Sequence, residues 1–213
     1  MNQRVIGILA VLVILGSLVT IVYRHHPMRK KSQGWAPLGQ LAARETSDLL
    51  KGHGKVAAVL FDTRRIGMQG EVAAFEEFKN ALKANPGVTL AGDTLLQPVK
   101  VNKDRLGFTA QQLQELGHRY AGADLIVCFG GASFVDIEKL EWDRTSNPRL
   151  VSVMSFIPQQ LRELFARQIL AFSLAPPIPG PAEAPPATLQ ENGLTVQVIT
   201  PETAATVLGV PAR

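Results

Sequence analysis

The chain has 213 residues, 46% hydrophobic and 19% charged, a composition that suits one or two ordinary domains and excludes collagen-like and fully disordered chains. Its net charge of +4 comes from the N-terminus. The first 31 residues hold five Lys or Arg and no acid, whereas the remainder holds 17 basic and 18 acidic residues. A nucleic-acid partner is therefore not expected. The single cysteine, Cys128, excludes an internal disulfide and a multi-cysteine metal site.

The first predicted element is a membrane-spanning helix over residues 5–23. This run of 19 uncharged residues, about 28 Å long as a helix, matches the hydrocarbon thickness of a bilayer. The alternative is a cleaved signal peptide, but its apolar core would be shorter and an A-x-A site would follow it. We therefore expect a retained single-pass anchor in the lipid bilayer. The basic flank after it favours a cytoplasmic C-terminal domain.

Four elements are predicted between the basic flank and residue 96. A partial amphipathic stripe over 38–51 predicts a short helix. The continuous apolar run 56–61 predicts a buried strand. Apolar residues at three- and four-residue spacing predict a helix over 71–84, and 88–96 is the next strand.

The second half of the domain repeats this alternation. A helix is predicted over 110–121, apolar strands over 123–129 and 150–156, a helix over 158–170, and a last short strand over 171–174. Apolar strands alternating with amphipathic helices predict an α/β fold: a three-layer α/β/α domain with a mainly parallel sheet.

The C-terminal part begins with six prolines in residues 175–187, which predict an extended linker. A strand-like run at 194–199 and a helix-like run at 201–208 follow. They could join the edge of the main sheet, pair with another chain or stay mobile. The predicted division is an anchor with its basic flank (1–31), a linker with a short helix (32–54), the α/β domain (55–175), a proline-rich linker (176–190) and a tail (191–213).

Three loops at the carboxyl ends of the predicted strands form the candidate binding site, because ligands of open α/β sheets bind at that edge. They are the loops at 62–70, 130–133 and 155–158, which we call the strand-end rim. The predicted binding residues are Asp62, Thr63, Arg64, Arg65, Gly130, Gly131, Ser133 and Ser155. Arginines beside a helix N-terminus suit a modest anion, and the glycines allow close approach of a ligand. The alternative for all three loops is ordinary turn chemistry.

Catalytic motifs are mostly absent from the sequence. There is no phosphate-binding loop, no G-x-S-x-G nucleophile elbow and no H-E-x-x-H zinc helix. Cys128 lies within an apolar strand and is expected to be a buried, inert thiol. The acidic run from Asp136 to Asp143 is interleaved with basic residues and is interpreted as a solvated loop. No cofactor and no metal are expected.

Four segments together resemble one known family. KVAAVLFDT followed by EVAAFEEFKNALKANPGV, and GADLIVCFGG followed by PRLVSVMSF, resemble a single lobe of periplasmic-binding-protein-like domains of the sugar- and amino-acid-receptor kind. The resemblance covers about residues 55–175. It implies the α/β fold, ligand binding where two lobes meet, and a periplasmic location, against the cytoplasmic one that the basic flank favours. The side of the membrane stays open.

Two functions remain as hypotheses. The favoured one is a membrane-anchored, non-enzymatic domain that binds a small molecule or a protein partner at the strand-end rim, within an envelope or transport assembly. The alternative is a hydrolase or transferase on a flavodoxin-like scaffold, with Asp62, Arg64 and Ser133 around one crevice. A third possibility is a structural anchor whose tail recruits a partner.

Overall fold

The computed structural model describes residues 35–62, 70–100, 106–131, 134–177, 188–191 and 194–209. Within these ranges, no helix has both the length and the apolar character needed to cross a membrane. The predicted anchor at 5–23 lies outside them.

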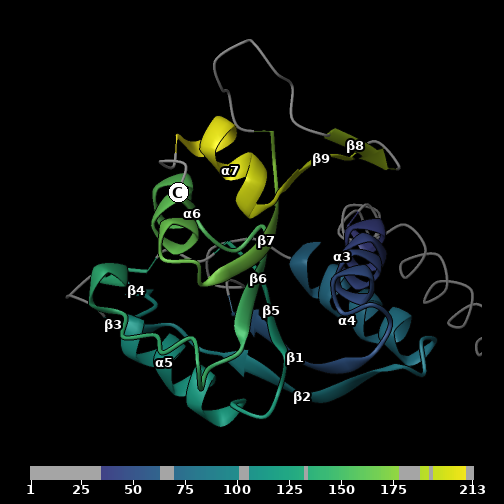
Figure 1. Cartoon of the computed structure of the whole chain (residues 1–213), viewed down its shortest axis with the longest axis horizontal. Helices are drawn as coiled ribbons and strands as arrows, with labels where there is room; N and C mark the ends of the chain where they lie inside the picture. The colour runs from purple at the N-terminus through teal and green to yellow at the C-terminus, as the bar shows by residue number, and fades with distance from the viewer. Residues whose placement is uncertain are drawn as a thin grey trace, which may run out of the picture.

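One large sheet organises the described residues. Its strands follow the order β2-β1-β5-β6-β7-β9-β8 (Figure 1). Neighbours from β2 to β7 run parallel, and β9 and β8 add antiparallel at the far end. Their bounds are β1 Gly54–Phe61, β2 Val88–Leu96, β5 Leu125–Phe129, β6 Arg149–Val153, β7 Leu170–Ala175, β8 Thr188–Glu191 and β9 Leu194–Ile199. A small antiparallel pair, β3 (Val99–Lys100) and β4 (Leu106–Gly107), follows β2.

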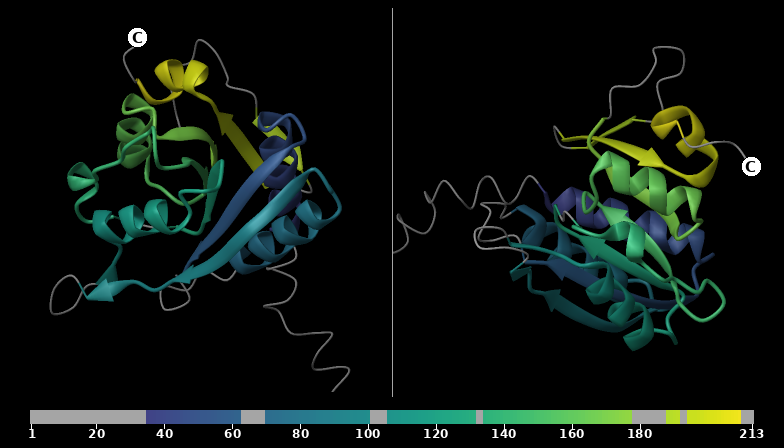
Figure 2. Two further views of the ribbon diagram at one scale, coloured as in Figure 1. Left: turned by 60° about the horizontal axis from the view of Figure 1, so that its bottom comes forward. Right: turned by 90° about the vertical axis from the view of Figure 1, so that its left-hand side faces the viewer.

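Helices cover both faces of the sheet, so the three-layer α/β/α prediction is confirmed (Figures 1 and 2). One face carries α3 (Ala36–Leu49) and α4 (Gly70–Lys83). The other carries α5 (Ala110–Arg119), α6 (Pro158–Ala166) and α7 (Pro201–Leu208), with a short 3-10 turn η2 at Ile137–Lys139.

Strand β1 shows why helices pack on both faces of the sheet. Alternate side chains of a strand point to opposite faces. Val56, Ala58 and Leu60 therefore pack beneath α3 and α4, while Ala57, Val59 and Phe61 pack on the α5 side. All six are buried. Both sets are apolar because neither face meets water, which explains the continuous apolar run.

Helix α3 belongs to the same packed layer as α4. Leu38, Leu41 and Ala42 are buried against the sheet layer. Gly39 lies so close to α4 that an added Cβ would stand 2.1 Å from the carbonyl oxygen of Ala74. Residues before the predicted start of the α/β domain at 55 thus contribute to its core, and the division of the chain into domains remains a prediction.

The predicted tail elements are also present. Strand β9 pairs with β7 through Ser173–Ile199, and α7 begins at Pro201 behind a Thr200 capping box. The tail joins the sheet edge, one of the three alternatives open from sequence. Arg162 of α6 donates a hydrogen bond from Nε to the carbonyl oxygen of Leu208, 2.5 Å away, which satisfies a free carbonyl at the end of α7.

Candidate functional site

The strand-end rim brings some of the predicted residues together. Asp62 follows β1, and Gly130 and Gly131 follow the neighbouring strand β5. Ser155 lies just beyond β6, the next strand along the sheet. Thr63, Arg64, Arg65 and Ser133 lie outside the described residues.

At the two glycines, other segments of this chain occupy the space in which a ligand was expected to approach the backbone. Gly130 has a φ of +110°, which favours glycine, and an added Cβ would stand 3.1 Å from the carbonyl oxygen of Phe61. The backbone N–H of Gly131 donates to Oε1 of Glu71, 2.8 Å away. Glu71 is almost fully buried at the start of α4. Its carboxylate therefore ties α4 to the end of β5, a role that no sequence pattern indicates.

Ser155 is fully buried. Its hydroxyl donates to the carbonyl oxygen of Cys128, and its backbone N–H donates to Oγ of Ser152. The bond to Cys128 fastens the end of β6 to β5, and the bond to Ser152 holds the turn that leaves β6. The third loop presents Ile157 to solvent instead.

Phenylalanine rings fill the rim on the α5 and α6 face. Phe61 packs edge-on against Phe108, Phe134 and Phe156, with ring centroids 4.9, 5.6 and 6.2 Å away. All four rings are buried. The amide of Gln160 donates to the carbonyl oxygen of Phe134, 2.7 Å away, and holds this turn in place. No sequence pattern indicates this cluster, because its members are far apart in the chain.

A pocket of about 330 Å³ lies on the opposite face, between α4 and the carboxyl-terminal halves of β1 and β2. We call it the α4–β2 pocket. Its lining combines carboxylates with apolar side chains and one lysine: Leu60, Phe61, Asp62, Glu71, Val72, Phe75, Glu76, Lys79, Asp93, Thr94 and Leu95. Of the predicted binding residues that the structure describes, Asp62 alone belongs to this lining.

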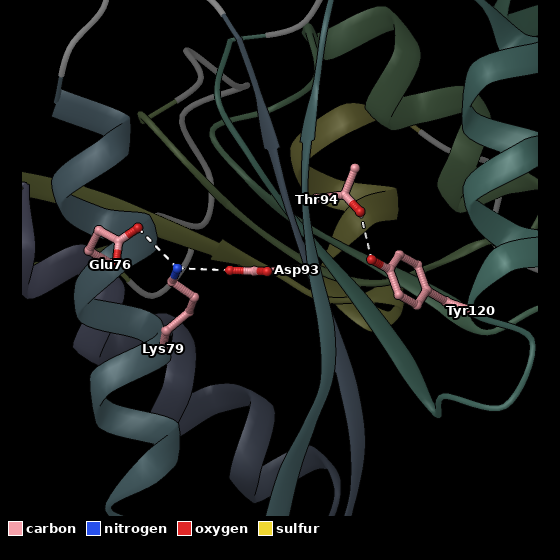
Figure 3. A network of polar contacts seen from close by, with 5 residues as sticks. All are labelled: Glu76, Lys79, Asp93, Thr94 and Tyr120. Carbon is pink, nitrogen blue, oxygen red and sulfur yellow. Dashed lines mark hydrogen bonds and ion pairs between the residues drawn. The ribbon is translucent and has the colours of Figure 1, made fainter.

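A β-bulge in β2 decides which side chains reach the pocket. Val56 pairs with Leu90, but Ala57 pairs with Gly92, so Ala91 is an extra residue in the strand. Beyond the bulge Asp93 turns toward α4, whereas Thr94 turns toward α5 (Figure 3). Thr94 there shares a hydrogen bond of 2.6 Å with the hydroxyl of Tyr120.

Lys79 organises the polar wall of the pocket. Its Nζ lies 2.9 Å from Asp93 and 3.0 Å from Glu76 (Figure 3). The same atom lies 4.6 Å from the centre of the Phe75 ring. Burial acts to lower the pKa of Lys79, but the hydrogen bonds and charges of Asp93 and Glu76 outweigh burial and raise it. The lysine therefore stays protonated and orients both carboxylates.

Replacing Lys79 by methionine should lower the free energy of unfolding by about 0.5 kcal/mol at neutral pH, because both partner carboxylates are half exposed. A lysine whose pKa is raised on folding stabilises the protein fully below its unfolded pKa, near 10.5. That contribution is lost as the pH rises through the folded pKa. The difference between wild type and Lys79→Met in urea unfolding should therefore persist at neutral pH and shrink above pH 10.5. If the difference in unfolding free energy between the two proteins did not change with pH, the ion pairs of Lys79 would not be its source.

Replacing Glu71 by alanine should cost more, about 1 kcal/mol, because the half-buried N–H of Gly131 loses its acceptor. Glu71→Gln keeps an acceptor oxygen and should cost less than Glu71→Ala. Urea unfolding of the three proteins checks the order. Equal stability of Glu71→Ala and wild type would show that the carboxylate does not tie α4 to β5.

Other residues singled out from sequence lie away from the pocket. Cys128 is fully buried, and burial raises the pKa of its thiol, as expected of an inert cysteine. Asp136 accepts a hydrogen bond from the N–H of Ala110 and so supports the start of α5. Among the described residues, no group of His, Cys, Asp and Glu could hold a metal ion.

No protein-family model and no curated protein sequence matches this chain. Solved structures do match. A solute-binding protein of an ABC transporter from Agrobacterium vitis, bound with alpha-D-tagatopyranose, is 16% identical over 84% of this chain and 61% of its own, with a TM-score of 0.53. The periplasmic binding protein of the arabinose ABC transporter from Shewanella sp. ANA-3, bound to L-arabinofuranose, is 12% identical over 80% and 58%, with a TM-score of 0.52.

A sugar-binding protein from Bacillus halodurans is 15% identical over 81% of this chain and 64% of its own, with a TM-score of 0.50. The chain thus spans less than two thirds of the length of these proteins. At this identity the likeness establishes the fold alone. The chain has a periplasmic-binding-protein-like α/β fold, and the resemblance found in the sequence is confirmed.

Proposed function

We propose that this protein is a non-enzymatic binding domain, anchored in a membrane by residues 5–23, that takes a small hydroxylated molecule in the α4–β2 pocket. The observation that carries the proposal is the pocket itself. It has the volume of a small-ligand site and lies at the carboxyl-end edge of the sheet, where open α/β sheets bind ligands.

The lining suits such a ligand chemically. The carboxylates of Glu76 and Asp93 are hydrogen-bond acceptors, which hydroxyl groups can satisfy, and Lys79 holds them in place. Leu60 and Leu95 supply an apolar wall beside them. The solved structures with this fold include proteins bound to sugars, and this supports a neutral, hydroxylated ligand.

The predicted rim residues stay part of the proposal, with Asp62 as the link between rim and pocket. Thr63, Arg64, Arg65 and Ser133 would contribute from their loops, and Gly130 and Gly131 from the backbone. A protein partner on the same rim is the second form of the proposal.

Calorimetry with the full chain in detergent tests the proposal against a panel of pentoses, hexoses and polyols. Asp93→Asn should weaken binding of any sugar that binds, because it removes one oriented carboxylate. Glu138→Gln is the matched control, since Glu138 is exposed on η2 and outside the pocket lining. Binding that Asp93→Asn leaves unchanged would place the site elsewhere.

The same titrations separate the enzyme alternative from the binding domain. Nuclear magnetic resonance of the recovered sugar should show no chemical change. Turnover that Asp62→Asn abolishes would replace the binding proposal with the hydrolase or transferase hypothesis.

The anchor has a test of its own. Carbonate washing should leave the full chain in the membrane fraction, and its intact mass should include residues 1–25. A mature N-terminus beyond about residue 25 would indicate a cleaved signal peptide instead.

A further inference from the structure

The exposed apolar side chains gather at one edge of the molecule. Among the described residues, the large apolar side chains that remain exposed are Val72, Leu95, Val99, Leu106 and Ile157, each 36–44% exposed. We call these five residues the apolar edge. All of them follow or adjoin the carboxyl ends of the parallel strands.

The topology places each of them there. Leu95 is the penultimate residue of β2, and Val99 and Leu106 lie in the β3–β4 pair that follows it. Val72 is in the first turn of α4, and Ile157 is the N-cap of α6, so each begins a helix that leaves a strand end. None of the five lies at the amino ends of the strands.

The chain also enters the fold at this edge. Trp35 stands immediately before α3, and its indole ring fills the space beside Gly70, where an added Cβ would stand 2.4 Å from a ring carbon. Gly70 is the first residue of α4 and therefore belongs to the carboxyl-end edge. Helix α3 thus begins beside the apolar edge.

Only eleven residues separate Trp35 from the end of the apolar run at Tyr23, a reach of at most about 40 Å. Those residues include Arg24, Arg29, Lys30 and Lys31 and no acid. The edge itself carries Lys100, which is exposed in β3. Nearby Glu76 and Asp93 are paired with Lys79.

We infer that the apolar edge docks on the surface of the bilayer in which residues 5–23 are anchored, a surface that contains anionic lipid headgroups. This inference rests on the anchor in the proposed function. Apolar side chains enter the boundary between headgroups and acyl chains, and lysines beside them pair with anionic lipid. A membrane accounts for both the apolar side chains and the basic connection that leads to them. The α4–β2 pocket, which Leu95 and Val72 line, then opens beside the membrane.

The test uses the full chain in vesicles of phosphatidylcholine with one fifth phosphatidylglycerol. Leu95→Cys and Ile157→Cys carry a fluorophore on the new thiol, while the buried Cys128 stays unlabelled. Gly122→Cys is the matched control. Gly122 lies in the turn before β5, at the opposite edge, with nothing within 4 Å of an added Cβ.

Lipid-attached nitroxides near the headgroups should quench roughly half or more of the emission at residues 95 and 157, because docked side chains lie about 5–10 Å into the boundary region. The control at 122 should be unaffected. Vesicles of phosphatidylcholine alone should show weaker quenching at both edge positions.

Equal quenching at all three positions would overturn the inference. Edge probes that are shielded from aqueous iodide but not quenched by lipid nitroxides would also overturn it, because a protein partner or a second copy would then cover the edge. Failure of the anchor is distinguishable, since carbonate would then release the chain from the vesicles. If the chain stays bound to the vesicles but the probes at residues 95 and 157 are not quenched, the docking inference is contradicted and the anchor is not.

Discussion

Val59→Asp should prevent the α/β domain from folding. Val59 is fully buried in the middle of β1, on the face that packs against α5, and its neighbours across the sheet are Thr94 and Cys128. An aspartate there would place an uncompensated carboxylate in an apolar layer. The cost is several kcal/mol, of the same order as the total of about 5–15 kcal/mol that holds a typical domain folded.

The measurement is the yield of folded protein and its circular dichroism after expression of the full chain. Val72→Asp is the matched control, because Val72 is half exposed on α4 and a carboxylate there remains in water. It should fold normally. Val59→Ala removes apolar volume without adding charge and should fold with reduced stability. Normal folding of Val59→Asp would contradict the burial of β1 on both faces.

Gly39→Ala should lower the free energy of unfolding by roughly 3 kcal/mol, although alanine is the better helix former by about 1 kcal/mol. The reason is the close approach of α3 and α4. The new Cβ would stand 2.1 Å from the carbonyl oxygen of Ala74 and 2.8 Å from the backbone nitrogen of Phe78. Both neighbours are backbone atoms, so the two helices must move apart and loosen Leu38 and Leu41 beneath them.

Thermal unfolding should show the effect as a drop in Tm of roughly 10 °C. Gly122→Ala is the control, because nothing lies within 4 Å of its added Cβ and its stability should change little. If Gly39→Ala is as stable as wild type or more stable, the helix propensity dominates and the close crossing is wrong.

The fold could be predicted because its signals are local. Apolar runs at β1 and β5 indicated strands that are buried on both faces, and the three- and four-residue spacing in α4 indicated an amphipathic helix. Each pattern follows from the repeat of a single element and needs no knowledge of its neighbours. The strand and helix at the C-terminus were found in the same way.

For the candidate site, the sequence allowed only the strand-end loops to be grouped at one edge of the sheet. Topology alone places loops of parallel strands at one edge, so Asp62, Gly130 and Gly131 could be grouped from sequence. The contacts that those residues make could not be predicted from the sequence. Glu71 reaches Gly131 across 60 positions of the chain, and Ser155 reaches Cys128 across 27.

The sequence by itself determined the alternation of strands and helices, the uncharged run at 5–23 and the charge balance of the two parts of the chain. The tertiary structure alone decided which face of β2 carries Asp93, because one extra residue at Ala91 reverses the alternation that a sequence pattern assumes. It also decided that Gly39 brings two helices together and that four distant phenylalanines close one side of the rim. Such features depend on distances between residues that are far apart in the chain, and a local pattern does not contain those distances.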